Sequence, residues 1–175
     1  VISAGGGHSY ATCLETDSLG NFYFLKCAED TPHGGTMLKV SVDGRQLSVL
    51  ATGFRNPHGL GIGPGGIITA ADQQGEWVPE TRLDVIKPGG FYGYMPMHKR
   101  AAAPTSYDPP LCWIPVQVDN SSGSQVWATS DEWGPLKGDL LHTSYGKGAL
   151  FLVLHEQVGG VRQGVGPGPR RHGST

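Results

Sequence analysis

Charged residues are scarce in this chain of 175 residues: they make up 16% of it, and the formal net charge is −2. Nucleic-acid-binding proteins concentrate Lys and Arg on one face, whereas here these residues are scattered along the sequence. We therefore expect no nucleic-acid partner. No apolar run reaches the roughly 18 residues that a membrane-spanning helix needs, so we also expect no membrane partner. The length is typical of one domain.

Cysteine is rare as well, and its pattern argues against two kinds of site. Cys13, Cys27 and Cys112 are odd in number and show no C-x-x-C spacing, so neither a disulfide framework nor a thiolate zinc site is indicated. The chain also lacks the G-x-S-x-G motif of serine hydrolases. Ser122 and Ser124 lie in a turn without a paired motif, so nucleophilic serine catalysis is not expected.

Glycine and proline, by contrast, are abundant, with 28 and 13 residues. The glycines flank short β-type runs, as in an all-β fold with many tight turns. These runs fall into three groups: 10–14, 21–27, 35–42 and 47–51; several runs within 59–94; and 125–129, 139–143, 150–154 and 160–162. Four antiparallel strands in such a group make one blade of a β-propeller. The sequence thus predicts an all-β, propeller-like fold with about three four-stranded blades.

Three blades do not close a ring, because propellers have about four to eight. We therefore expect an open or partial propeller over residues 1–163, followed by an irregular tail over 164–175. The Pro-rich segment 97–118 is expected to be an irregular loop. Bare strand edges invite pairing with another chain, so the sequence also predicts a homo-oligomer formed through the open sheet edges.

Candidate binding residues are densest between Gly53 and Pro96. Arg55, Asn56 and His58 place a fixed charge, an amide and an imidazole side by side, just before a predicted hairpin. The second strand of this hairpin ends in a polar group, and loops at strand ends commonly carry binding residues. That group consists of Asp72, Gln73, Gln74 and Glu76.

Two kinds of chemistry are open to these residues. Calcium prefers carboxylate and amide oxygens, so Asp72 and Glu76 are candidate metal ligands; a solvated acidic loop is the alternative. Histidine side chains titrate near neutral pH, so His58 is a candidate general base. A structural histidine at a turn is the alternative for His58.

Three motifs of this stretch carry a resemblance to a known family. They are RNPHGL at 55–60, a G-x-hydrophobic-hydrophobic-x-x-x-D run that ends at Asp72, and KPGGFYGYMP at 87–96. In this order they resemble the central blades of the glucose/sorbosone dehydrogenase family of β-propellers, to which soluble quinoprotein glucose dehydrogenases belong. Quinoprotein members carry an Asp-Glu pair that helps to hold calcium, and this chain has Thr81 and Arg82 at the matching positions.

The resemblance implies a calcium-assisted dehydrogenase of sugars or aldehydes of the sorbosone or glucose type, with pyrroloquinoline quinone (PQQ) as a further cofactor. His58 and Arg55 would be catalytic, and Asp72 or Glu76 would hold the calcium. A small-molecule substrate and a bacterial periplasmic or secreted location are implied as well. The residues expected to contact the cofactor are Arg55, Asn56, Gln74 and Tyr92.

Two other functions remain open. Calcium propellers of the gluconolactonase and paraoxonase kind open lactones or esters, with a central cation that polarises the carbonyl and positions water. In that case Asp72 or Glu76 would bind the metal and His58 would be the base. The other alternative is a non-catalytic binding module, or an inactive fragment of a larger protein.

Overall fold

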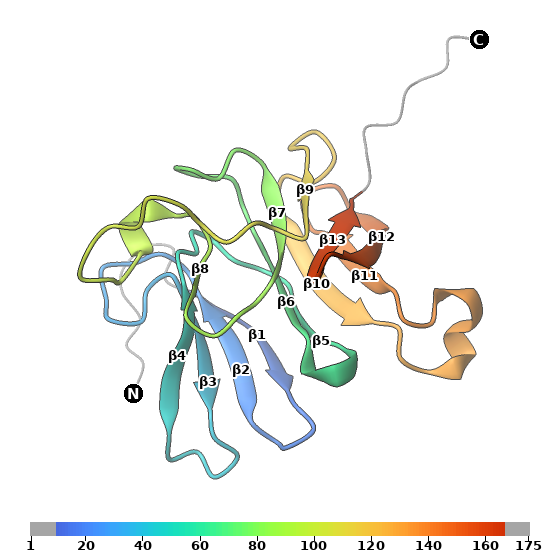
Figure 1. Cartoon of the computed structure of the whole chain (residues 1–175), viewed down its shortest axis with the longest axis horizontal. Coiled ribbons are helices and arrows are strands. Elements are labelled where there is room, and N and C mark those ends of the chain that lie inside the picture. Colours follow the sequence, from blue (N-terminus) through green and yellow to red (C-terminus); the bar gives the residue numbers. More distant parts are fainter. Residues whose placement is uncertain (1–9, 167–175) are drawn as a thin grey trace.

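The structure is a computed structural model that describes residues 10–166. These residues form thirteen β-strands in three separate sheets, which fan out side by side without closing into a ring (Figure 1). The strand orders are β1-β2-β3-β4-β8, β5-β6-β7-β9 and β10-β11-β12-β13. We call these sheets blades 1, 2 and 3. The predicted all-β, three-bladed and open fold is therefore confirmed.

The strands are short, as expected for propeller blades. Blade 1 contains β1 (Ala11–Thr16), β2 (Phe22–Lys26), β3 (Thr36–Val40), β4 (Leu47–Thr52) and β8 (Gly90–Phe91). Blade 2 contains β5 (Leu60–Ile62), β6 (Ile68–Asp72), β7 (Thr81–Val85) and β9 (Cys112–Ile114). Blade 3 contains β10 (Ser122–Trp127), β11 (Leu140–Ser144), β12 (Ala149–Val158) and β13 (Val161–Val165). Three 3-10 turns complete the described elements: Pro64–Gly66, Met95–Met97 and Asp131–Leu136.

Two hydrophobic cores hold the blades together. In strand β2, successive side chains alternate between faces, and Tyr23 and Leu25 turn toward blade 2, where they pack with Leu60 and Ala70. Blade 2 uses its other face against blade 3. The members of this second core include Leu83, Ile114, Trp127, Leu140 and Val153. Full burial of each large apolar side chain contributes about 1.5–3 kcal/mol, so the two cores fix the order of the blades.

Arg82 of β7 ties the long connection after β8 to blade 2. Its guanidinium is fully buried and bonds Asp84, with Nε and Nη2 at 2.8 and 2.6 Å from Oδ1. The same group donates to the carbonyl oxygens of Tyr92 and Asp108 at 2.7 and 2.6 Å. Burial raises the pKa of Asp84 to about 6, although the charge of Arg82 opposes this shift. Arg82 is therefore a structural cation within the blade.

The outer strand of blade 2 differs from the sequence prediction. Residues 90–91 pair in parallel with β4 of blade 1, and the fourth strand of blade 2 is β9, from the segment predicted to be an irregular loop. The three residues of β9 lie between Pro110 and Pro115. Because the strand is so short and its surroundings are rich in proline, the sequence pattern did not indicate it. In addition, β13 continues to Val165, beyond the expected boundary at 163, and Gly164 N donates to Leu111 O at 2.8 Å.

The remainder of the predicted tail, residues 167–175, lies outside the described residues, as do residues 1–9. Within the described part of the chain, no helix is long and apolar enough to cross a membrane. Cys13, Cys27 and Cys112 are free thiols, two of them buried and Cys13 half-buried. The cysteines therefore form no disulfide, as their odd number and spacing indicated.

Candidate functional site

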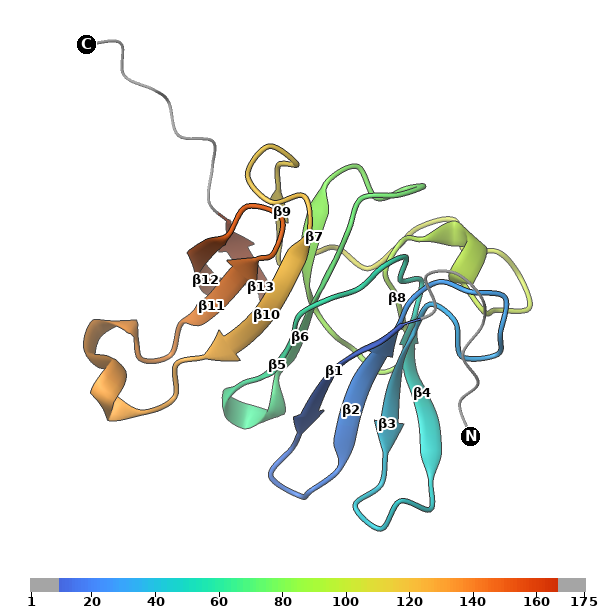
Figure 2. The same ribbon diagram turned by 180° about the vertical axis from the view of Figure 1, so that it is seen from behind.

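The first strands of the three blades meet side by side. Strand β5 lies between β1 and β10, as both views of the ribbon show (Figure 2). Gly59, just before β5, adopts a φ of +92°, and a Cβ there would lie 2.2 Å from the carbonyl oxygen of Gly123. Only glycine allows this approach of backbone to backbone. The three first strands are thus the innermost ones, and they begin at the same end of the molecule.

A cavity of about 550 Å³ opens at this end. Each blade contributes to it: Tyr10–Cys13 come from the start of β1, Asn56, His58 and Gln73 from the ends of β5 and β6, and Ser121, Ser122 and Tyr145 from blade 3. We call this cavity the axial pocket. Its described lining contains hydroxyl, amide, imidazole and thiol groups but no Asp, Glu, Lys or Arg.

Backbone hydrogen bonds place Asn56 and His58 in the axial pocket. His58 N donates to Ala71 O, and Ala71 N donates to Gly59 O, both at 3.0 Å, which extends the β5–β6 ladder upstream of β5. The Thr12 hydroxyl donates to Pro57 O at 2.8 Å and joins this segment to blade 1. The side chain of His58 is solvent-exposed at the pocket.

Asp72 holds in place the segment before β5, which contains Asn56 and His58. Its Oδ2 accepts a hydrogen bond from Arg55 N at 2.7 Å, and its Oδ1 accepts from Asn56 N and Gln73 N at 2.9 and 2.8 Å. The side chain is fully buried. Burial raises the pKa of Asp72 to about 7, and the three N–H donors act in the opposite direction. Asp72 therefore holds together the two chain segments that carry the polar groups of the pocket.

A chain of side-chain hydrogen bonds crosses the pocket floor from blade 1 to blade 3. The Cys27 thiol donates to Asn56 Oδ1 at 3.0 Å, and Asn56 Nδ2 donates to Gln73 Oε1 at 3.2 Å. Gln73 Nε2 in turn donates to Ser121 Oγ at 3.0 Å, while Arg55 Nη1 donates to Gln73 Oε1 at 3.3 Å. Because Gln73 is held at both ends of its amide, it is the centre of this network.

Beneath Ser121, blade 3 contains a fully buried polar cluster. Asp119 Oδ2 lies 2.7 Å from His142 Nε2, and Asp119 Oδ1 accepts from the Ser144 hydroxyl at 2.7 Å. Burial raises the pKa of Asp119, but the hydrogen bonds from His142 and Ser144 outweigh it and lower the pKa overall. The backbone N–H of Ser121 also donates to Asp119, at 3.2 Å. Through this bond to Ser121, the cluster helps to hold the floor of the axial pocket in place.

Two buried polar side chains at the start of β10 have no hydrogen-bond partner among the described residues. They are the hydroxyl of Ser122, which lines the axial pocket, and the amide of Gln125, which lies next to Gly59. Both residues are at least 95% buried, with exposures of 3% and 5%. An unpaired buried polar group costs about 1–3 kcal/mol. A bound ligand or ordered water at the pocket floor would therefore be stabilised by Ser122.

The structure brings together only some of the site residues predicted from the sequence. Asn56 and His58 line the axial pocket, and Arg55 reaches its edge through Gln73. Gln74 does not line it. Tyr92 is placed elsewhere: it is fully buried, stacks on Phe54 with ring centroids 5.2 Å apart, and donates its hydroxyl to Val85 O. Tyr92 is a core residue because its ring fills the space between blades 1 and 2.

The two predicted metal ligands are also not combined into one site. Both oxygens of Asp72 already accept backbone N–H groups inside the protein, and Glu76 lies exposed in the loop that follows. Among residues 10–166, no group of three or more His, Cys, Asp or Glu is arranged to hold a metal ion. The side chains at this position therefore do not fit the predicted calcium site.

Sequence reasoning did not assign Thr12, Gln73, Ser121 or Ser122 to the site. Gln73 stood in the polar loop that was singled out, but nothing in the sequence distinguished it from Gln74. For the two serines the available signal was their position in the turn just before the first predicted strand of blade 3, residues 125–129. In a propeller, such positions from all blades converge near the axis.

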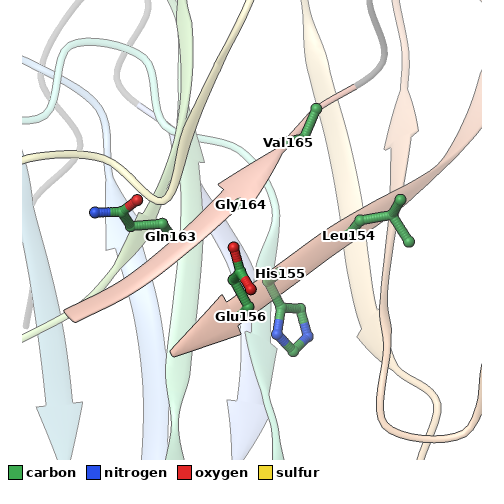
Figure 3. A pocket seen from close by; sticks show the side chains of 6 residues that line it. All are labelled: Leu154, His155, Glu156, Gln163, Gly164 and Val165. Carbon is green, nitrogen blue, oxygen red and sulfur yellow. The ribbon is translucent and has the colours of Figure 1, made fainter. Parts of the chain in front are cut away.

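Two further cavities lie away from the axial pocket. One, of about 520 Å³, is at the opposite end of the inner strands, between the turn after β1 and the Gly63–Gly66 turn. The other, of about 320 Å³, lies on the β12–β13 hairpin (Figure 3). It is lined by Leu154, His155, Glu156, Gln163, Gly164 and Val165. The cavity of about 520 Å³ is lined mostly by turn residues of blades 1 and 2, with only Thr129 from blade 3 and no histidine, and the cavity of about 320 Å³ is lined by blade 3 alone.

No protein-family model matches the sequence, and no curated protein sequence matches it. Solved structures do match. An oxidoreductase from Thermus thermophilus, described as a glucose dehydrogenase, superposes with a TM-score of 0.65 at 21% identity, over 87% of this chain and 50% of its own. The chain thus shares the fold of about half of this protein.

Two other solved structures support the same fold. The apo-form of the soluble aldose sugar dehydrogenase from Escherichia coli matches with a TM-score of 0.62 at 12% identity, over 88% of this chain and 52% of its own. The PQQ-bound form of aldose sugar dehydrogenase from Streptomyces coelicolor matches with a TM-score of 0.60 at 15% identity, over 83% and 45%. The partial propeller thus spans about half the length of these proteins.

Proposed function

We propose that this partial propeller binds a sugar or a related aldehyde in the axial pocket and takes part in its oxidation. One observation carries the proposal: all three blades contribute to a pocket that combines an exposed histidine, His58, with uncharged polar groups. Support comes from the fold, which the chain shares with a glucose dehydrogenase and with aldose sugar dehydrogenases.

The lining favours a neutral polyhydroxylated ligand. Amide and hydroxyl groups both donate and accept hydrogen bonds, which suits sugar hydroxyls, and the described lining offers no fixed charge to balance an ionic ligand. Ser122 contributes a buried hydroxyl that has no other partner among the described residues. The volume of about 550 Å³ lies within the usual range of small-molecule sites, about 300–1,000 Å³.

His58 would act as the general base. Oxidation of a sugar hydroxyl removes a proton from oxygen and a hydride from carbon, and an imidazole at hydrogen-bond distance can accept the proton. Asn56 and Gln73 would orient the substrate, because their amides are held in place by hydrogen bonds from Cys27 and to Ser121. In this proposal the binding groups are preorganised, while His58 itself is accessible.

The hydride requires an acceptor, and a quinone such as PQQ would supply that chemistry when bound. Asn56 and Gln73 offer amide groups for it. PQQ carries several carboxylates, however, and the described residues place only one cation, Arg55, at the edge of the pocket. Arg55 would therefore pair with one of these carboxylates, and the amides of Asn56 and Gln73 would bind polar atoms of the quinone.

Calcium assistance and lactone hydrolysis receive no comparable support. Both assign the metal to Asp72 or Glu76, and in the structure the Asp72 carboxylate is fully buried and bonded to three backbone N–H groups. We therefore do not propose the hydrolase alternative. The bacterial periplasmic or secreted location stays a prediction.

The proposal is tested by a dye-linked oxidation assay of the chain with a panel of aldoses, with added PQQ. We expect aldose-dependent dye reduction, and we expect His58→Gln to lower kcat about 10²–10⁴-fold, the usual contribution of a general base. The control is His33→Gln, a histidine in the β2–β3 connection that does not line the pocket. Absence of dye reduction with every aldose, or full activity of His58→Gln, would contradict the proposal.

A further inference from the structure

The β12–β13 hairpin and the outer part of blade 2 enclose a cavity of about 250 Å³. Strand β13 lies next to β9 (Figure 1), and Gly164 N donates to Leu111 O at 2.8 Å, which joins the hairpin to blade 2. The cavity lies closer to the hairpin turn, because Gly160 and Val161 line it. We call it the lateral cleft. It shares no lining residue with the axial pocket or with the two other cavities described above.

The walls of the lateral cleft are apolar. Blade 2 contributes Ile67 and Val85, which pack against the second core, and the connection before β9 contributes Pro109 and Leu111. Val161 of the hairpin completes the apolar lining and is 48% exposed. An apolar cavity of about 150 Å³ can hold benzene. The lateral cleft therefore has room for one ring-sized apolar group together with a small polar substituent.

Two cations and no carboxylate line the same cleft. Lys87 lies on the blade 2 side and Arg162 on the hairpin. Lys87 Nζ lies 3.7 Å from Asp108 Oδ1, but the lysine side chain is 61% exposed, and exposed ion pairs of this kind are weak. Within residues 10–166, Arg162 forms no ion pair with a carboxylate, and its one described hydrogen bond is to a histidine. The lining thus has two positive charges and an apolar surface between them.

Arg162 is held in position by this uncharged histidine. Arg162 Nη1 lies 2.9 Å from His155 Nδ1. Because an arginine can only donate, Nδ1 is the acceptor. Burial lowers the pKa of His155, and the charge of Arg162 lowers it further. The ring of His155 packs on Trp127, with ring centroids 5.1 Å apart. The guanidinium is therefore oriented by the fold, while its charge is balanced by no neighbouring anion.

The combination of groups selects the chemistry of the ligand. An arginine presents parallel N–H groups that match the two oxygens of a carboxylate, and Nε and Nη2 of Arg162 are not used by the bond to His155. A neutral apolar molecule would leave the two cations without a partner. A sugar would find few hydrogen-bonding groups, because the uncharged polar side chains of the lining are limited to Gln157.

We propose that the lateral cleft is a second binding site, which takes a small carboxylate with an apolar body, such as an aromatic acid. The carboxylate pairs with Arg162 and Lys87, and the apolar body lies against Val85 and Leu111. Because blade 2 and the hairpin both contribute to the site, a bound ligand holds the hairpin against blade 2. The proposal does not depend on the function assigned to the axial pocket.

A titration with benzoate, followed by two-dimensional ¹H–¹⁵N NMR, tests the proposal. Benzoate should shift the backbone amide signals of Val85, Leu111 and Arg162 along one saturable curve, with a dissociation constant in the millimolar range expected for so small a ligand. The amides of Thr12 and Asn56, in the axial pocket, should not shift. Two matched probes separate the contributions. Benzyl alcohol has the ring without the charge and should bind at least about tenfold more weakly, and gluconate, a carboxylate without an apolar body, should not shift these amides.

Two substitutions test the role of each cation. Arg162→Gln should weaken benzoate binding at least about tenfold, as expected for the loss of a charged hydrogen-bond donor. Lys87→Gln, at an exposed residue that does not contact His155, should weaken it about threefold. Arg45→Gln is the control: it removes the same charge from an exposed residue of the β3–β4 turn and should bind benzoate as the wild type does.

The amide spectrum of each variant also reports whether its fold is kept, and Lys87→Gln keeps the test valid if Arg162→Gln disturbs the hairpin. No shift of the three amides with benzoate would overturn the proposal. Equal affinity for benzyl alcohol would overturn it as well, because the cleft would then be an apolar contact only. Unchanged benzoate affinity in both Arg162→Gln and Lys87→Gln would have the same consequence.

Discussion

At the scale of single residues, Asp72 shapes the axial pocket without lining it. Its two oxygens accept the backbone N–H groups of Arg55, Asn56 and Gln73, so one carboxylate joins the segment before β5 to the end of β6. This role requires a carboxylate in a fully buried position. The electrostatic cost of that burial gives a measurable dependence of stability on pH.

The first prediction concerns this dependence. The pKa of Asp72 is raised from 3.8 to about 7 in the fold, so its contribution to stability is fully present below pH 4 and is lost as the pH rises toward 7. A tenfold change in acid strength between the folded and unfolded chain corresponds to about 1.4 kcal/mol, so the loss amounts to a few kcal/mol. Urea denaturation at a series of pH values measures it as a falling free energy of unfolding.

Comparison with Asp72→Asn isolates this effect, because Asp84, with a pKa of about 6, titrates in the same window. The difference in unfolding free energy between wild type and Asp72→Asn should decrease from pH 4 to pH 7. Asp30→Asn, at an exposed bend after β2, is the control and should leave the slope unchanged. A difference that stays constant or grows over this range would contradict the prediction.

At the scale of elements, the contact between β5 and β10 depends on a residue without a side chain. Gly59 has a φ of +92° and leaves no room for a Cβ beside the carbonyl oxygen of Gly123. Gly65, in the turn between β5 and β6, has a φ of +71° with nothing within 4 Å of a built Cβ. Both glycines have a positive φ, so an alanine would be strained at either position. Only at Gly59 would the added Cβ collide with a neighbouring atom.

This pair gives the second prediction. Gly65→Ala should cost about 1 kcal/mol of stability, from backbone strain alone. Gly59→Ala should cost about 1–3 kcal/mol more than Gly65→Ala, the usual cost of overpacking. The added Cβ would push β5 and β10 apart. Equal losses for the two variants in urea denaturation would show that β5 and β10 do not approach each other as closely as described.

The elements also show how far the sequence alone can lead. The strands of blades 1 and 3 could be predicted because each is an apolar run bounded by turn residues, such as Asp43-Gly44 before β4. Strand β9 could not, because Cys112–Ile114 is short and lies between prolines, and only pairing with β7 makes it a strand. Likewise, Asn56 and His58 were found within one motif, whereas Ser121 joins them only through the packing of blade 3 on blade 2.

At the scale of the whole molecule, the axial pocket is a product of the arrangement of blades. No single blade contains it, and its floor is a hydrogen-bond network that runs from Cys27 in blade 1 through Gln73 to Ser121 in blade 3. The chain spans about half the length of the sugar dehydrogenases whose fold it shares. Its function therefore depends on whether these three blades already form a competent binding site.

Binding of a neutral sugar in the axial pocket is the central claim, and a titration followed by two-dimensional ¹H–¹⁵N NMR tests it most directly. Glucose should shift the backbone amide signals of Thr12, Asn56 and Ser121, one from each blade, with a single saturable curve. Glucose 6-phosphate should shift them less, because the described lining has no cation to balance its charge. Shifts confined to the turns at the opposite end of the inner strands, or no shifts with any aldose, would contradict the claim.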